Sequence, residues 1–106
     1  MGTLWAAVLS LVLGPPLLRG LPTEPGAGTA ALQARLLAGH PPGSPADDLI
    51  GTLLRAGFEV RAGEFARLSR DEGDCVLGWE VAWTTAEGRV GDLVGHQYLD
   101  CAEGAP

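Results

Sequence analysis

Residues 75–101 read CVLGWEVAWTTAEGRVGDLVGHQYLDC, and this stretch decides the fold because it predicts two paired strands enclosed by two cysteines. Four apolar side chains recur at every second position and would share one face of a strand: Leu77, Trp79, Val81 and Trp83. The following Ala86-Glu87-Gly88 is a hairpin turn signal, since glycine tolerates a positive φ. Residues 90–101 then return as the second strand.

The two cysteines face each other in this hairpin. A turn centred near Glu87-Gly88 places Cys75 opposite residues 99–101, within the span of a disulfide. The pair lacks C-x-x-C spacing, and the two histidines, His40 and His96, add no metal-site spacing. A structural disulfide between Cys75 and Cys101 is the prediction; two free buried thiols, or a redox or metal-binding pair, are the alternatives. No metal and no cofactor are expected.

The register of the hairpin is open by one residue. Because side chains alternate between the two faces of a strand, a slip of one residue exchanges those faces. In one register Leu93 and Leu99 share the tryptophan face, and in the other register Val94 and Tyr98 do.

Two helices are predicted before the hairpin. The first spans residues 30–38 with Thr29 as its N-cap, and its apolar stripe consists of Leu32, Leu36 and Leu37. The second has Ser44 as N-cap and Pro45 at its first helical position, and it ends at Gly57. Its stripe consists of Ala46, Leu49, Ile50, Leu53 and Leu54.

After Gly57 the apolar period changes from helical to strand-like. Phe58, Val60, Phe65 and Leu68 predict one or two short strands broken near residues 62–63, and residues 71–74 predict a polar turn without calcium-loop spacing. The predicted fold is therefore α+β, with two short helices packed on a three- to four-stranded antiparallel sheet.

An apolar run at residues 4–13 has the length of a signal-peptide core and is too short to span a bilayer. No basic residue precedes it, so an N-terminal helix that packs on the domain is the alternative. We predict a signal peptide over residues 1–21, a Pro- and Gly-rich linker over 22–28, and one domain over 29–103. The predicted location is periplasmic or secreted, where disulfides persist, and membrane contact is expected only through an uncleaved N-terminal segment.

Charge narrows the range of partners. The 106-residue chain carries a formal charge of −6, and its seven basic residues are all arginine. Since the arginines after the first segment are dispersed, they form no basic stripe, and nucleic acid is not an expected partner.

The order of elements resembles the SmpA/OmlA (BamE-like) family and the wider β-lactamase-inhibitor-protein-like fold. The resemblance is carried by Gly43-Ser44, by the second helix with Leu49, Ile50, Leu53 and Leu54, and by the tryptophan-bearing strand before Gly88. It implies a small envelope adaptor or inhibitor domain and does not imply catalysis.

The predicted function is a non-catalytic, exported interaction or adaptor domain for a protein or peptide partner. The candidate binding surface consists of Phe65, Trp79, Trp83, His96 and Tyr98. For the two tryptophans the core is the favoured alternative, because large rings fill the interior of so small a domain. The alternative function is a small-molecule or glycan binder, or a small hydrolase, built on Trp79, Trp83 and His96; His96 has no evident nucleophile or orienting partner. No catalytic residue is assigned.

Overall fold

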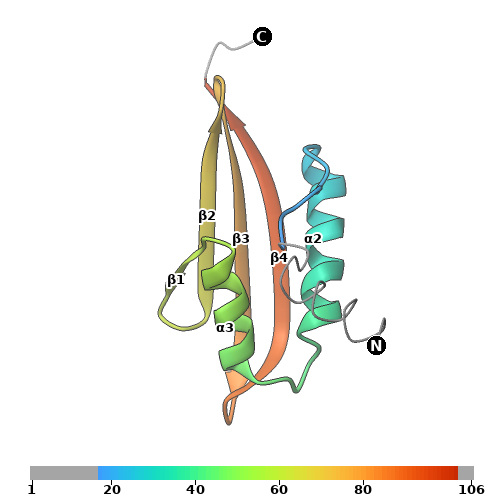
Figure 1. The fold of residues 1–106 in the computed structure, drawn as a ribbon, viewed down its shortest axis with the longest axis vertical. Helices are drawn as coiled ribbons and strands as arrows, with labels where there is room; N and C mark the ends of the chain where they lie inside the picture. Colours follow the sequence, from blue (N-terminus) through green and yellow to red (C-terminus); the bar gives the residue numbers. More distant parts are fainter. Residues whose placement is uncertain (1–16, 103–106) are drawn as a thin grey trace, which may run out of the picture.

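The computed structural model describes residues 17–102. This part of the chain forms α2 (Pro25–Gly39), α3 (Ala46–Arg55), β1 (Glu59–Arg61), β2 (Phe65–Glu72), β3 (Cys75–Ala86) and β4 (Arg89–Cys101). The strands pair in chain order into one antiparallel sheet; α2 runs beside β4, and α3 packs near β1 (Figure 1). The predicted α+β class is confirmed.

The predicted export run, residues 4–13, lies outside the described residues. Within residues 17–102, neither helix has the length and apolar character needed to cross a membrane.

The turn before α2 belongs to the folded domain, although the sequence analysis assigned residues 17–21 to a signal peptide. Leu17 is buried in the core, and Leu18 and Leu21 pack against it. Arg35 of α2 fixes this turn, because its Nη1 donates hydrogen bonds to the carbonyl oxygens of Leu17 and Arg19, at 3.0 and 2.6 Å.

The first helix starts earlier than predicted. Its N-cap is Glu24 rather than Thr29, and Pro25–Gly39 includes residues that were predicted as linker. The Glu24 carboxylate accepts hydrogen bonds from the backbone N–H groups of Ala27 and Gly26, which hold the pKa of Glu24 below its ordinary value. Pro25 needs no N–H at the first helical position, so a proline that suggested a linker begins the helix instead.

The end of α3 is as predicted, but its start is not. Gly57 has φ +99°, and the N–H groups of Gly57 and Phe58 donate to the carbonyls of Leu54 and Leu53 in a Schellman motif. The N-cap is Pro45, and Ser44 makes no capping bond. The carbonyl of Ser44 instead accepts a hydrogen bond from the N–H of Val90 of β4 at 2.8 Å, and Pro45 forms a bridge with Arg89, so this segment is tied to the end of β4.

The β3–β4 hairpin contains a bulge that sets its register. Ala86 pairs with Arg89 across a two-residue turn, but the register shifts by one residue between Trp83 and Thr85. Beyond the bulge Cys75 pairs with Cys101, and the disulfide between them is present. The hairpin therefore adopts the register in which Leu93 and Leu99 lie on the tryptophan face.

The core lies between the helices and one face of the sheet. Fully buried leucines project into it from both helices: Leu32, Leu36, Leu49 and Leu53. Leu37 and Leu54, predicted in the same stripes, are exposed because the helices bury narrower faces than expected. Gly95 of β4 allows α2 to approach, since a Cβ there would lie 2.6 Å from Leu36.

One buried polar group, Gln97 of β4, joins the sheet to α2. Its Oε1 accepts a hydrogen bond from Trp79 Nε1 at 2.7 Å, and its Nε2 donates to the carbonyl of Pro22 at 2.8 Å. Gly28 makes room for this amide, because any side chain at that position would overlap it. Since every polar atom of the Gln97 side chain has a partner, its burial is compatible with a stable core.

The free edge of β4 is covered by side chains of α2. The Thr29 hydroxyl accepts from the N–H of Gln97 and donates to its carbonyl, at 2.8 and 3.2 Å. The Gln33 amide accepts from the N–H of Gly95 and donates to the carbonyl of Leu93, at 2.6 and 2.7 Å. These side chains take the place of a neighbouring strand, so this part of the edge is not available to another chain.

Candidate functional site: the helix-free face of the sheet

The two faces of the sheet have different surroundings. Trp79 and Trp83 point toward the helices and are 2% and 4% exposed. They belong to the core, and so they are not part of the binding surface that the sequence analysis considered. The opposite face carries the other three candidates, Phe65, His96 and Tyr98, and no helix of residues 17–102 packs on it.

An apolar row crosses the helix-free face. Cross-strand pairing places Phe65 of β2 beside Ala82 of β3, and Ala82 beside Val94 of β4. Val94 is 58% exposed, and Phe65 is half-buried. An aliphatic and an aromatic side chain therefore lie side by side on a face that no described helix covers.

A charged row lies beside the apolar one. Glu59, Arg67, Glu80 and His96 follow one another across β1 to β4, with acidic and basic groups alternating. Opposite charges in direct cross-strand positions attract each other, so the row is compatible with the sheet. The row therefore gives this face a defined pattern of acidic and basic groups.

Tyr98 forms the aromatic part of this face. It pairs with Gly78, and a Cβ on Gly78 would overlap the Tyr98 ring, so the ring lies across the glycine. His96 stacks beside it, with ring centroids 6.3 Å apart. Because glycine has no side chain, position 78 leaves the space in which the Tyr98 ring lies against the sheet.

The alternative site built on Trp79, Trp83 and His96 does not form. His96 is exposed on the helix-free face, and the two tryptophans are buried on the other face. Among residues 17–102, no group of three or more His, Cys, Asp or Glu side chains is placed to hold a metal ion.

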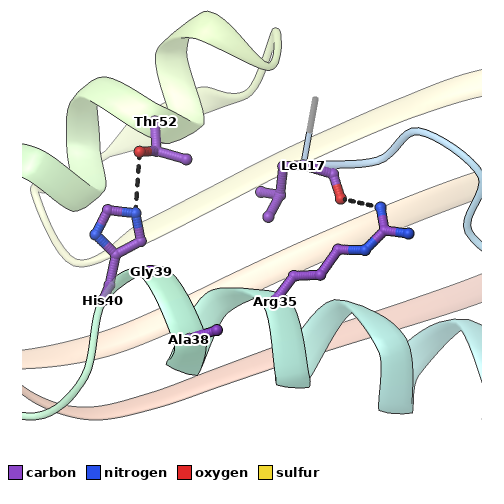
Figure 2. Close-up of a pocket in the computed structure, with 6 residues that line it drawn as sticks. All are labelled: Leu17, Arg35, Ala38, Gly39, His40 and Thr52. Atoms are coloured by element: carbon purple, nitrogen blue, oxygen red, sulfur yellow. Dashed lines mark hydrogen bonds between the residues drawn. The ribbon is translucent and has the colours of Figure 1, made fainter. Parts of the chain in front are cut away.

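The sequence analysis considered the second histidine, His40, only as a metal ligand. His40 follows α2, is 8% exposed, and lies with Nε2 2.9 Å from Thr52 Oγ1 of α3. Its only sequence signal is its position directly after an apolar helix. It lines a cavity of about 530 Å³ between the two helices, together with Leu17, Arg35, Ala38, Gly39 and Thr52 (Figure 2).

Burial of His40 predicts a pH-dependent stability. Desolvation lowers the pKa of His40 below its ordinary value of 6.5; Asp48 opposes this shift and Arg55 adds to it. As the pH falls through about 6.5, the unfolded chain binds a proton that the folded chain does not, so stability is lost on acidification.

Denaturation at pH 7.5 and pH 5.5 tests this effect. The native chain and a His96→Gln variant, which alters only the exposed histidine, should both lose stability at pH 5.5. The loss should be smaller in His40→Gln, which has no imidazole to protonate. Equal losses in all three proteins would contradict the assignment.

No protein-family model matches this chain, and neither the curated proteins nor the solved structures contain a match to it.

Proposed function

We propose that this chain is a non-catalytic binding domain that acts in an oxidising compartment, periplasmic or extracellular, and holds a protein or peptide partner on its helix-free sheet face. The observation that carries the proposal is the apolar row of Phe65, Ala82 and Val94, which no described helix covers, beside a row of alternating acidic and basic side chains. An apolar centre with a polar surround is the usual composition of a protein interface.

Three further points support the proposal. The disulfide between Cys75 and Cys101 is consistent with an oxidising location. The resemblance to small envelope adaptor domains implies the same kind of role. The covered edge of β4 also favours the face over that edge as the place of contact, because α2 already occupies the backbone groups of Leu93, Gly95 and Gln97.

Photo-crosslinking in cells that express the full chain tests this function. A benzophenone side chain at position 94 should give a discrete adduct with one partner protein. Position 54 is the matched control, since Leu54 and Val94 are 56% and 58% exposed but Leu54 lies on α3, on the other side of the sheet. Adducts at both positions, or at position 54 alone, would contradict the proposal.

Once the partner has been captured, point variants measure the contribution of the face. Val94→Glu and Tyr98→Ala should each weaken binding by at least about tenfold, as expected for residues at the centre of an interface. Leu54→Glu adds the same charge away from the face and should leave binding unchanged. Equal weakening by Val94→Glu and Leu54→Glu would indicate a general effect of charge or folding rather than a contact.

A further inference from the structure

The cavity between α2 and α3 is separate from the sheet face and has the size of a small-molecule site. Its volume of about 530 Å³ falls within the range typical of ligand pockets. Figure 2 shows Leu17 and the extended stem of Arg35 on one side, His40 and Thr52 on the other, and Ala38 and Gly39 between them. Leu17, Ala38 and the Arg35 methylenes make these walls largely apolar.

The polar groups at the His40 end do not require a polar ligand. His40 Nε2 and Thr52 Oγ1 share a hydrogen bond of 2.9 Å and so satisfy each other. His40 Nδ1 is buried and has no partner in the described part of the chain, but in Figure 2 it lies on the side of the ring away from Leu17 and Arg35. This end of the cavity therefore suits hydrocarbon better than charge.

Arg35 is the remaining polar group, and it is held in position. Its Nη1 donates to the carbonyls of Leu17 and Arg19, which leaves the other guanidinium N–H groups uncommitted among residues 17–102. The ion pairs of the described chain are Arg61–Glu59 and Arg70–Glu72, so Arg35 has no carboxylate partner there. A fixed arginine without a counter-ion beside an apolar cavity is suited to a carboxylate.

We propose that this cavity binds a medium-chain aliphatic carboxylate. In Figure 2 the Arg35 guanidinium lies past Leu17, at the end of the cavity away from His40, and its free N–H groups would donate to the carboxylate there. The hydrocarbon chain would run back along the Arg35 stem, against Leu17 and toward Ala38. Charge complementarity at one end and apolar walls along the rest define this ligand class. The proposal is independent of the sheet-face function, because none of these residues lies on that face.

Titration of the ¹⁵N-labelled full chain with octanoate, followed by NMR, tests the proposal. Octanoate should bind saturably at one site and shift the amide signals of residues 35–40 and Thr52. Octyltrimethylammonium, with the same hydrocarbon chain and the opposite charge, should not bind there. Failure to saturate, shifts that map to other residues, or equal binding of the cation would overturn the proposal.

Two pairs of variants locate the site. Ala38→Phe fills the cavity and should abolish binding, whereas Ala30→Phe, also at an exposed position of α2 but outside the cavity, should bind normally. Arg35→Met should weaken binding at least about tenfold, as expected for loss of a charged partner, and Arg35→Lys, which keeps the charge but not the planar set of donors, should weaken it less. If Arg35→Met does not fold, the comparison of Ala38→Phe with Ala30→Phe tests the location of the site on its own. Unchanged binding in Ala38→Phe would overturn the assignment.

Discussion

Leu53→Ala is expected to lower the free energy of unfolding by about 2–5 kcal/mol. Leu53 is fully buried in the core from α3, and its carbonyl accepts the hydrogen bond from Phe58 that closes the Schellman motif. The truncation removes packed methyl groups. Because core packing and the Schellman hydrogen bond both hold this end of the helix, the surrounding structure can relax only slightly into the cavity that is left. Equilibrium unfolding in urea measures the change.

The neighbouring residue provides a matched control. Leu54→Ala makes the same chemical change one position along the helix, where the side chain is 56% exposed. Its effect should stay below about 0.5 kcal/mol, because a mostly exposed side chain leaves no cavity. Similar midpoints for Leu53→Ala and the native chain would show that α3 does not pack on the sheet in this orientation.

The end of α3 could be predicted from the sequence because its determinants are local. Gly57 adopts the positive φ that few other residues tolerate, and Phe58 follows it at the position that contacts the last turn. The start could not be predicted in the same way. Ser44 has the residue type of an N-cap, but its backbone pairs with Val90, more than forty positions away, and this pairing moves the first helical residue to Ala46.

The face that carries the candidate site depends on one extra residue in β4. Opposite Thr84, β4 contributes both Gly91 and Asp92, and the Asp92 N–H donates to the Thr84 hydroxyl at 2.9 Å. A side chain at Gly91 would collide with that hydroxyl, so glycine permits the bulge. The alternating pattern of apolar residues does not reveal an extra residue in a strand. For this reason the sequence analysis left two registers of the hairpin open.

Without the bulge, the side chains on the two faces of β4 would be exchanged. A regular ladder from the same turn would bring Asp100 rather than Cys101 opposite Cys75, and it would turn Val94, His96 and Tyr98 toward the helices. The bulge instead places these three residues on the helix-free face and buries Leu93 and Gln97. The bulge at Thr84, Gly91 and Asp92 therefore determines which side chains form the candidate surface. None of these three residues was among the site residues predicted from the sequence.

The sequence prediction grouped five side chains that the structure divides between the two faces of the sheet. It grouped aromatic side chains by type, and only Phe65, His96 and Tyr98 share a face. Trp79 differs because its indole N–H finds a buried acceptor in Gln97, a partner that periodicity does not identify. The cavity residues Leu17, Arg35 and His40 are brought together only because the turn before α2 and the residue after α2 both lie near α3 in the folded chain.

Removal of the disulfide in the double variant Cys75→Ser/Cys101→Ser is expected to cost about 2–4 kcal/mol of stability. The bond joins residues 26 positions apart that already pair in the β3–β4 ladder, so the folded structure should remain while the unfolded chain gains conformational freedom. Denaturant unfolding of the two proteins measures the loss, and an unchanged far-UV circular dichroism spectrum confirms that the variant is folded.

Reducing agent separates the effect of the crosslink from the effect of the serine hydroxyls. Dithiothreitol should lower the midpoint of the native chain toward that of the double variant, and it should not change the variant. If serine itself disturbed the ladder, the variant would be less stable than the reduced native chain. Two thiols that react quantitatively in natively purified protein would refute the disulfide. A domain of this size buries only a small hydrophobic core. Loss of the crosslink should therefore remove a large part of its total stability.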